Sequence, residues 1–417
     1  MLIGIVADDL TGAADSVAPF AQQGYIAGVG LSVDAGARYP PREWDALALN
    51  TELRDRTIVK PTLIVSVARR ATRRLIACAP RIYFKKIDST LRGHLRPELD
   101  GMLRELPGRT ALICPASPAN GRTVEHGVLH VGGVPLIQTG FVEGEAEPER
   151  FATVRSAFEM AAEPTTGEIG LTILRKGVET VERELDRQRA TGVRTVFCDA
   201  VTPDDMHILA QLVLHRPEHY LPVGSAGFTR AIAESMPRNT TPGSPTWDTE
   251  RFTRGRILVV VGSMHPISRR QAHRLLRGEG IIPLVMEYAD DSETYVNSQI
   301  FHERWRAGEK LFVLITSEET NSRASGDIVP ILWDMATWAG LPTTVSPFDG
   351  YVVTGGHTAQ QICDAFWGTA LQIFGESEPG IVRAMLLRDR DLPDIPMILK
   401  AGGFGDEGTL ARCVGLE

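Results

Sequence analysis

Short apolar runs alternate with amphipathic stretches along most of the chain. Residues 2–7 and 45–50 are short and rich in aliphatic side chains, which is typical of buried strands. Residues 61–79 place Leu63 and Val67 near the spacing of one helix face. Strands that alternate with helices indicate βαβ units and a mainly parallel sheet. The predicted strands of the first half are residues 2–7, 25–32, 45–50, 82–87, 111–116 and 195–200.

This alternation is interrupted at residues 237–255, a polar stretch with three prolines and two glycines, which is typical of a linker. We therefore predict an α/β fold of two domains with mainly parallel sheets, residues 1–236 and residues 256–417. Since open α/β sheets bind ligands beyond the carboxyl ends of their strands, we expect the chemistry to follow the strands. The predicted strands of the second domain are residues 256–262, 281–287, 310–316, 350–356 and 396–403.

The composition narrows the class of partner. A chain of 417 residues exceeds what one core usually organises, which supports two domains. The net charge is −8, and no basic field suited to nucleic acid is present. No apolar segment approaches the ~20 residues that span a membrane, and the first residues lack the features of a signal peptide. Five scattered cysteines, none at CxxC spacing, predict reduced thiols in a cytoplasmic protein rather than a zinc site or a disulfide framework.

Two adjacent acids, Asp8 and Asp9, follow the first predicted strand and precede Thr11 and Gly12. A helix that begins here exposes N–H groups that attract anions. A carboxylate beside it is able to accept a proton from a substrate hydroxyl or to bind Mg²⁺. Capping of the helix explains one acid but not two. We therefore predict a functional role for this pair.

The densest cluster of chemistry-bearing residues lies within residues 84–99, directly after another predicted strand. Arginine binds a carboxylate or phosphate through two hydrogen bonds, lysine adds a point charge, and aspartate and serine bind sugar hydroxyls. This mixture suits a polyhydroxy carboxylate, whereas an ordinary capped loop leaves the cations unexplained. The cluster contains Lys86, Asp88, Ser89 and Arg92, and Arg54 follows a further predicted strand.

Three glycine-rich loops follow predicted strands of the second domain, within residues 259–271, 352–362 and 399–408. Glycine lets backbone N–H groups approach phosphate oxygens closely. Together the loops favour a nucleoside di- or triphosphate, although none is a P-loop or a regular GxGxxG fingerprint. Phosphoryl transfer in the cleft between the domains would use both the polar cluster of the first domain and the glycine-rich loops of the second. This reaction depends on positioning, cations and a carboxylate base.

These motifs resemble those of the four-carbon acid sugar kinases, which include 3-oxo-tetronate, D-threonate and D-erythronate kinases. The most specific stretches are DDLTGAAD and KKIDSTLRG, and the others, in the family's order over nearly the whole chain, are NTELR, GRTVEHG, VGSAGF, GSMHPISRRQ, TGGHTA and KAGGFG. The family has an N-terminal sugar-binding domain and a C-terminal nucleotide-binding domain. The resemblance implies that ATP, with Mg²⁺, phosphorylates the terminal 4-hydroxyl of a four-carbon sugar acid.

The resemblance also implies roles for individual residues. The catalytic residues would be Asp8, Asp9, Lys86 and Asp88. The sugar acid would be bound by Arg54, Ser89 and Arg92. The nucleotide would be bound by Ser263, Gly355, Gly356, His357, Thr358 and Gly402. Either Asp8 or Asp9 would be the base, and the ligands of the metal stay open.

Two departures from the family pattern support an alternative. His357 stands where the family usually has an acid, and residues 262–265 depart from its Gly-Ser-x-Ser pattern. The alternative is a catalytically impaired protein that binds a sugar acid and a nucleotide and acts in regulation. A third hypothesis is another transferase, or a lyase, that uses Lys86 as a cation or as a Schiff-base amine. Base rates of assembly favour a homodimer.

Overall fold

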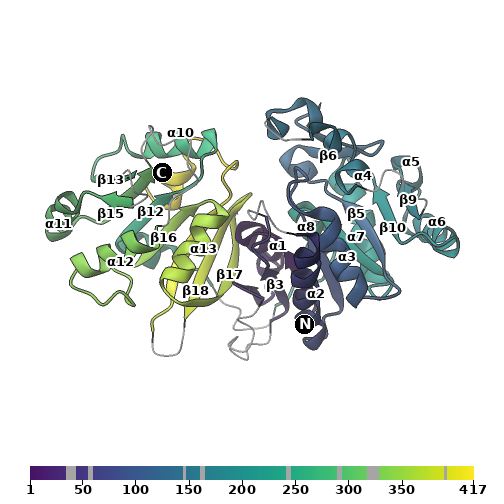
Figure 1. Ribbon diagram of the computed structural model, residues 1–417, viewed down its shortest axis with the longest axis horizontal. Helices are drawn as coiled ribbons and strands as arrows, with labels where there is room; N and C mark the ends of the chain where they lie inside the picture. Colours follow the sequence, from purple (N-terminus) through teal and green to yellow (C-terminus); the bar gives the residue numbers. More distant parts are fainter. Residues whose placement is uncertain are drawn as a thin grey trace. The chain divides into compact units, whose positions relative to one another are not determined.

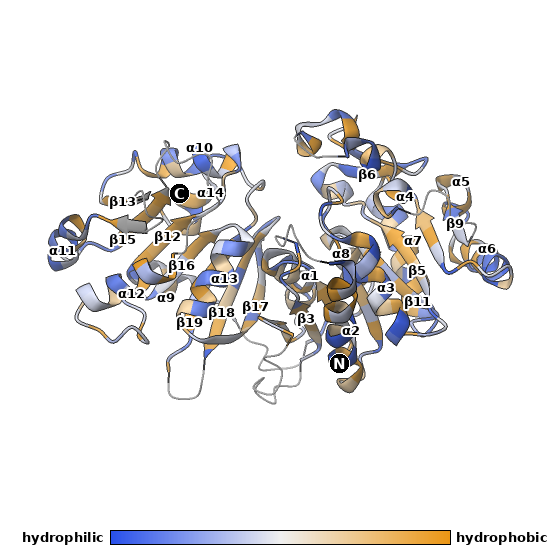
Figure 2. Cartoon of the chain, in the orientation of Figure 1, coloured by the Kyte–Doolittle hydropathy of each residue, from blue (hydrophilic) through white to orange (hydrophobic). Residues whose placement is uncertain are grey.

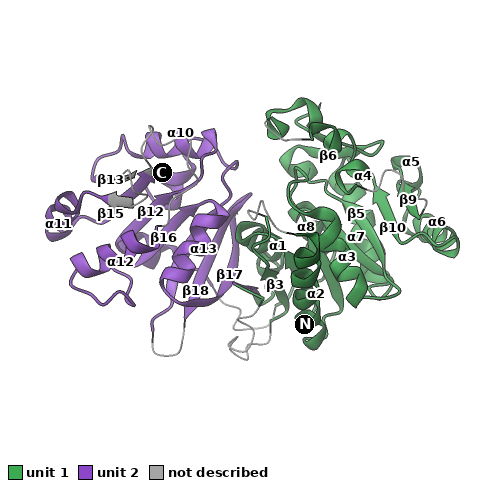
Figure 3. Cartoon of the chain, in the orientation of Figure 1, with its two compact units in different colours: residues 1–27, 32–36, 41–242 green, residues 28–31, 37–40, 243–417 purple. Residues whose placement is uncertain are grey.

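The structure is a computed structural model that describes residues 1–33, 44–54, 60–143, 147–159, 165–240, 246–288, 294–316, 328–388 and 392–417. Two compact units divide the chain, coloured green and purple in Figure 3. Unit 1 comprises Met1–Ala27, Ser32–Gly36 and Pro41–Pro242, and unit 2 comprises Gly28–Leu31, Ala37–Pro40 and Gly243–Glu417. The bounds of the linker stay a prediction, and its residues 241–245 lie outside the described residues.

Unit 1 is built on a parallel sheet with the strand order β3-β1-β4-β11-β5-β10-β9. Its strands are β1 (Ile3–Ala7), β3 (Ala46–Asn50), β4 (Ile82–Lys86), β5 (Thr110–Cys114), β9 (Thr166–Ile169), β10 (Thr195–Cys198) and β11 (Tyr220–Gly224). Its helices, which Figure 1 labels, are α1 (Leu10–Gln22), α2 (Pro61–Ala77), α3 (Leu95–Glu105), α4 (Val154–Ala157), α5 (Leu171–Leu174), α6 (Val178–Ala190), α7 (Pro203–His215) and α8 (Ala226–Glu234). A separate antiparallel sheet contains β6 (Arg122–Glu125), β7 (Val128–Val131) and β8 (Val134–Pro135).

The neighbouring strands β1 and β4 are followed by helices on opposite faces of the sheet. The chain passes from β1 through α1 and the short strand β2 (Ala27–Gly30) to β3, and then from β3 through α2 to β4 on the other side of β1. Right-handed crossovers place α1 and α2 on opposite faces. The packing agrees, because α2 contacts α3 whereas α1 contacts α8. The carboxyl ends of β1 and β4 therefore flank a topological switch point, where open α/β sheets bind ligands.

Unit 2 contains a mixed sheet with the strand order β14-β13-β15-β12-β16-β19-β18-β17, in which β13, β15, β12, β16 and β19 are parallel. Its strands are β12 (Ile257–Val261), β13 (Ile281–Tyr288), β14 (Thr294–Val296), β15 (Leu311–Thr316), β16 (Gly350–Thr354), β17 (Gly368–Glu378), β18 (Ile381–Arg388) and β19 (Ile395–Lys400). Its helices are α9 (Thr249–Arg254), α10 (Pro266–Leu275), α11 (Ser298–Arg306), α12 (Val329–Trp338), α13 (Gly356–Ala365) and α14 (Thr409–Cys413). The short strand β2 (Ala27–Gly30) follows β17 in the strand order.

The hydropathy of the elements explains why these layers form. The central strands of both sheets appear orange in Figure 2, whereas most helices show a blue face, since both faces of a central strand are covered. All residues of β1, β4, β12 and β16 are buried. The α/β fold predicted from the sequence is therefore confirmed. None of the helices in the described ranges is long and apolar enough to cross a membrane.

Candidate functional site

Asp8 and Arg54 form a buried ion pair beyond the ends of β1 and β3. The Nε of Arg54 lies 2.8 Å from Asp8 Oδ2, and its Nη2 lies 2.7 Å from Asp8 Oδ1. The side chain of Asp8 is 2% exposed. The third nitrogen of Arg54, Nη1, lies 3.0 Å from Asp9 Oδ1 and 3.6 Å from Asp88 Oδ1. Arg54 therefore links three of the predicted carboxylates through one guanidinium group.

Asp9 has a different environment, because it is the N-cap of α1. Its Oδ1 accepts a hydrogen bond from the Gly12 N–H at 3.0 Å, and its Oδ2 accepts one from the Thr11 hydroxyl at 2.7 Å. A side chain at position 12 would not fit, since its Cβ would lie 2.3 Å from Asp9 Oδ1 and 3.0 Å from Lys86 Nζ. Gly12 thus permits a close approach of the cap, the lysine and the first turn of α1.

Asp88 and its arginine lie beyond the end of β4. The Nε and Nη2 of Arg92 donate to the two oxygens of Asp88 at 2.9 and 3.0 Å. The backbone N–H of Thr90 donates to Asp88 Oδ2 at 3.1 Å, and the Thr90 hydroxyl donates to the same oxygen. Thr90 rather than Ser89 therefore holds this carboxylate. Ser89 lies beside it and is half-buried.

Lys86 is the last residue of β4 and is buried, with 4% of its surface exposed. Its ammonium donates one hydrogen bond, at 3.0 Å, to the Ile87 carbonyl. Within the described ranges it has no ion-pair partner, unlike Arg54 and Arg92. Its ammonium lies against Gly12, in the first turn of α1, where backbone N–H groups add a partial positive charge. Lys86 therefore places a cation beside the N-terminus of α1, among the predicted carboxylates.

The charges of the two paired acids follow from burial and from the neighbouring cations. Burial raises the pKa of Asp8. The nearby cations Arg54 and Lys85 together lower it by more than burial raises it, so the pKa lies below its ordinary value. Burial likewise raises the pKa of Asp88, and Arg54 and Arg92 bring it well below its ordinary value. Both carboxylates are therefore ionised at neutral pH.

A second buried ion pair, Lys85 with Glu98 of α3, lies behind this cluster. The ammonium of Lys85 is 2.8 Å from Glu98 Oε2, and both side chains are 1% exposed. Burial raises the pKa of Glu98 to about 7, although Lys85 opposes this shift. Lys85 also donates at 2.8 Å to the carbonyl of Lys86. The pair therefore ties the end of β4 to α3, and Lys85 does not face the predicted carboxylates as a free cation.

In unit 2 the three glycine-rich loops converge, because they follow the adjacent strands β12, β16 and β19. The N–H of Ser263 donates to the Thr354 hydroxyl at 3.2 Å. A Cβ on Gly402 would lie 2.2 Å from Ser263 Oγ, and one on Gly355, where φ is +98°, would lie 3.6 Å from Ser263 N. Ser263, Gly355 and Gly402 are therefore immediate neighbours, as expected of a single anion-binding site.

The remaining predicted residues of unit 2 belong to α13. Gly356 is its first residue, and Thr358 lies against Gly262, where a Cβ would be 1.8 Å from Thr358 Oγ1. His357 is exposed, and its Nε2 lies 3.2 Å from Nε2 of Gln361 one turn later. His357 therefore contacts its own helix, whereas Thr358 packs against the first glycine loop.

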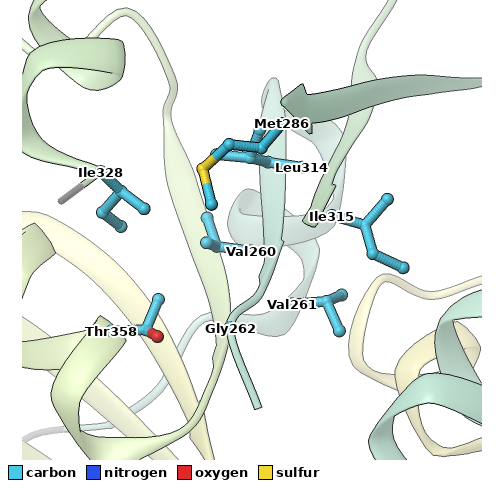
Figure 4. A pocket seen from close by; sticks show the side chains of 8 residues that line it. All are labelled: Val260, Val261, Gly262, Met286, Leu314, Ile315, Ile328 and Thr358. Carbon is cyan, nitrogen blue, oxygen red and sulfur yellow. The ribbon is translucent and has the colours of Figure 1, made fainter. Parts of the chain in front are cut away.

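An apolar cavity adjoins these loops on one side. It is lined by Val260, Val261, Gly262, Met286, Leu314, Ile315, Ile328 and Thr358. Figure 4 shows the side chains of Met286 and Val260 pointing toward one another. The cavity holds about 10 Å³, which is close to the space that one water molecule needs and too small for a purine ring.

Comparison with known proteins connects the two units to two domain families. Residues 3–232 match a family described as a sugar-binding N-terminal domain, and residues 258–410 match one described as a nucleotide-binding C-terminal domain. The chain is 31% identical to a D-threonate kinase of Cupriavidus necator over 416 residues, which cover 97% of this chain and 95% of the relative. The chain belongs to the four-carbon acid sugar kinase family.

Further members of this kinase family cover the chain as fully. A D-threonate kinase of Bordetella bronchiseptica is 28% identical, over 98% of this chain and 96% of the relative. A D-erythronate kinase of Heliobacterium modesticaldum is 25% identical, over 98% of this chain and 95% of the relative. A solved structure of a Haemophilus influenzae protein shares the fold, with a TM-score of 0.74 at 21% identity and 99% coverage of both chains.

The structure brings most of the predicted residues together within each unit. In unit 1 they are Asp8, Asp9, Arg54, Lys86, Asp88, Ser89 and Arg92, and in unit 2 they are Ser263, Gly355, Gly356, Thr358 and Gly402. Their roles stay predictions. From the sequence, Lys85 was part of the predicted cluster, but no individual role was predicted for Lys85, Glu98 or Lys400. Lys85 and Lys400 stand at the ends of β4 and β19, but nothing in the sequence tells a buried lysine from an exposed one.

Proposed function

We propose that this kinase transfers the γ-phosphoryl group of ATP to the terminal 4-hydroxyl of a four-carbon sugar acid. The observation that carries the proposal is the cluster of three aspartates, two arginines and a lysine at the switch point of unit 1. Such a cluster offers acceptors for several hydroxyls and a cation for a carboxylate. The names of the relatives support the same substrate class, which includes threonate, erythronate and 3-oxo-tetronate.

The three carboxylates differ in the hydrogen bonds that they accept and in their exposure to solvent. A carboxylate has about four acceptor sites. Asp88 receives four donors, of which three reach Oδ2 and one reaches Oδ1. Its pKa lies well below its ordinary value, because Arg54 and Arg92 outweigh the effect of burial, so it is a weak base. Asp8 receives two donors from Arg54, but its side chain is 2% exposed.

Asp9 has an open acceptor site at Oδ2, which receives one donor, and unlike Asp8 and Asp88 it is not held by two hydrogen bonds from one arginine. It receives three donors, from Thr11, Gly12 and Arg54, and its side chain is 13% exposed. We assign Asp9 as the base that accepts the proton of the 4-hydroxyl as its oxygen attacks the γ-phosphorus. Lys86 and the first turn of α1 lie beside it. They would stabilise the negative charge on the transferring group or on the substrate carboxylate.

Unit 2 would bind the triphosphate of ATP at the loops that contain Ser263, Gly355 and Gly402. Backbone N–H groups and a helix N-terminus are the donors that phosphate oxygens prefer. Within the described parts of the chain, no three His, Cys, Asp or Glu side chains gather to hold a metal ion. The N–H groups of the loops fit a Mg²⁺ ion that is bound by the phosphate oxygens of ATP rather than by a cluster of side chains. Mg²⁺ commonly keeps several waters and binds through substrate phosphates. Bound Mg²⁺ would neutralise phosphate charge.

The test is ADP release with Mg-ATP and a panel of D- and L-threonate, D- and L-erythronate and their 3-oxo forms. We expect turnover on at least one acid, and a loss in kcat of about 10²-fold or more for Asp9→Asn. Asparagine is as good an N-cap as aspartate, so this variant removes the base and keeps the helix cap. A kcat for Asp9→Asn close to that of the wild type would refute the assignment of the base.

The second candidate is a binding protein that has lost catalysis. His357 in place of the family's usual acid is the observation that favours it. This candidate predicts binding of a four-carbon acid in calorimetry without ADP release, and a gain of activity in His357→Asp. Turnover by the wild type on any acid of the panel would discard it. A homodimer stays a prediction that sedimentation would test.

A further inference from the structure

Lys400, the last residue of β19, is a buried cation directly behind the glycine loops of unit 2. It is 0% exposed. Its ammonium donates to the Ser268 hydroxyl at 3.2 Å, to the Ala401 carbonyl at 3.1 Å and to the Gly402 carbonyl at 3.2 Å. All three acceptors are neutral. In the ranges that the structure describes, no acid pairs with it.

The elements around Lys400 supply no compensating charge. Beside it, β16 places Thr354 and β18 places Ile381, while α10 contributes Ser268. The titratable group that faces it is Cys413 of α14, whose pKa burial raises to about 12, so this thiol is neutral. A buried charge without a counter-ion is unfavourable, and an anion that binds nearby would relieve it.

The charged groups farther out are paired with one another. Glu378 of β17 is bound by Arg412 of α14 at 2.6 and 3.0 Å. Arg412 also binds Asp406 at 2.8 Å. Arg383 of β18 is a further cation and therefore adds to the positive field. Burial lowers the pKa of Lys400 to about 8, as expected for a lysine whose charge lacks a partner.

The hydrogen bonds of Lys400 also orient the loop. In a trans peptide unit the C=O and the N–H point in opposite directions. Because Lys400 attracts the carbonyls of Ala401 and Gly402, the following N–H groups, of Gly402 and Gly403, point away from the buried ammonium. Neither N–H has a hydrogen-bond partner in the described parts of the chain. Two successive N–H groups beside Ser263 form an anion-binding concavity.

We propose that Lys400 is the positioning residue and buried counter-charge for the phosphates of ATP in unit 2. It acts through the loop, since its ammonium is fully covered and its three protons are donated to Ser268, Ala401 and Gly402. This inference rests on the proposed nucleotide site and adds a residue that the sequence analysis did not identify. If bound ATP raises the pKa of Lys400 by one, then ATP binds the protein with a charged Lys400 tenfold more tightly than the protein with a neutral Lys400.

The experiment is isothermal titration of ATP at about pH 8, in two buffers that differ in ionisation enthalpy. Burial lowers the pKa of Lys400 to about 8, so the lysine is partly deprotonated at this pH, and we expect the wild type to take up a fraction of a proton per ATP. Lys400→Met should lose this uptake and bind ATP about tenfold more weakly or worse. Lys310→Met, a change at an exposed lysine of the same unit, should behave as the wild type.

The thermal stability of the variant separates this role from a merely structural one. Each carbonyl that Lys400 contacts keeps another donor, since Phe404 N–H donates to Ala401 O at 3.2 Å and the Ser268 hydroxyl donates to Gly402 O at 2.8 Å. We therefore expect Lys400→Met without ATP to melt no lower than the wild type, while the increase in its melting temperature on ATP addition shrinks. A structural lysine would give the opposite pattern.

Two further arms keep the result decisive. Lys400→Arg keeps the charge but does not titrate, so it should bind ATP within a few-fold of the wild type and take up no proton. Proton uptake as large as that of the wild type in either Lys400 variant would overturn the proposal.

Inorganic triphosphate is titrated in parallel. Binding of triphosphate but not of ATP, with uptake that depends on Lys400, would support the counter-charge and refute the nucleotide site. Binding of neither would overturn both. ATP binding with this uptake, but no phosphorylation of any acid, would refute the proposed reaction alone.

Discussion

The ion pair between Arg54 and Asp8 should contribute more to the stability of unit 1 than any exposed pair of the chain. Its two hydrogen bonds measure 2.7 and 2.8 Å, and the Asp8 side chain is 2% exposed. Replacing Arg54 by methionine leaves Asp8 buried with no cation at hydrogen-bond distance. Removing one partner of a buried pair costs about 3–5 kcal/mol. Because the Arg54 side chain is 14% exposed, we expect about 3 kcal/mol.

This loss translates into a shift in melting temperature. For a folding unit of 150–250 residues, 1 kcal/mol corresponds to about 2–4 °C, so Arg54→Met should lower the transition of unit 1 by about 6–12 °C. Hydrogen exchange on peptides that cover β1 and β4 reports this stability for unit 1 itself. Asp8→Asn should lose a similar amount, because it leaves the guanidinium without its main partner.

The double variant tests the reasoning behind this magnitude. Once Arg54 is methionine, Asp8→Asn removes the unpaired charge, so the double variant should lose less than the sum of the single losses, by about 2 kcal/mol or more. Arg73→Met, which breaks an exposed pair with Glu105, is the matched control and should melt close to the wild type. Additive single losses, or an Arg54→Met loss below about 1 kcal/mol, would refute the argument.

Three other predictions concern pH and the nucleotide loops. Asp8 and Asp88 have a pKa below the ordinary 3.8, so their contribution to stability is fully present above pH 3.8 and is lost as the pH falls below it. Urea denaturation between about pH 5 and about pH 2 would measure this loss. Glu98, whose pKa is raised from 4.5 to about 7, binds its proton more tightly in the folded state, so stability falls as the pH rises through this range, and Glu98→Gln should abolish that slope. Gly402→Ala would place a Cβ 2.2 Å from Ser263 Oγ and should raise the KM for ATP about tenfold without changing that for the acid; an unchanged KM for ATP would contradict the placement of the nucleotide.

The positions of the site residues along the chain were predictable because the strands are parallel. Every residue that directly follows an apolar run reaches the same edge of its sheet, whatever the order of the strands. This is why Asp8 and Lys86 could be grouped, and why Ser263, Gly355 and Gly402 converge. The same reasoning failed for β17 and β18, which the sequence analysis did not identify. Their hairpin is antiparallel and turns at Gly380, where φ is +73°.

The partners of these residues were not predictable, because sequence gives the position of a side chain but not its direction. Asp8 and Asp9 are adjacent, yet one is held by an arginine and the other caps a helix. Capping therefore explains one acid of the pair, as expected, but the sequence did not say which. Likewise, the arginines expected to bind a sugar acid are held by Asp8 and Asp88.

The two units differ in how their buried charges are balanced, and this difference suits the two substrates. In unit 1, three carboxylates face Arg54, Arg92 and Lys86, so the cluster is close to neutral and its dipoles are fixed. Such a site favours a ligand with several hydroxyls and a single charge, because every donor and acceptor is already oriented. In unit 2, Lys400 has no acid to compensate it among the described residues, and the loops present N–H groups rather than side-chain charges. A site with surplus positive charge favours a ligand with several negative charges. The charge balance of each unit thus favours the sugar acid in unit 1 and the polyphosphate in unit 2, independently of any sequence motif.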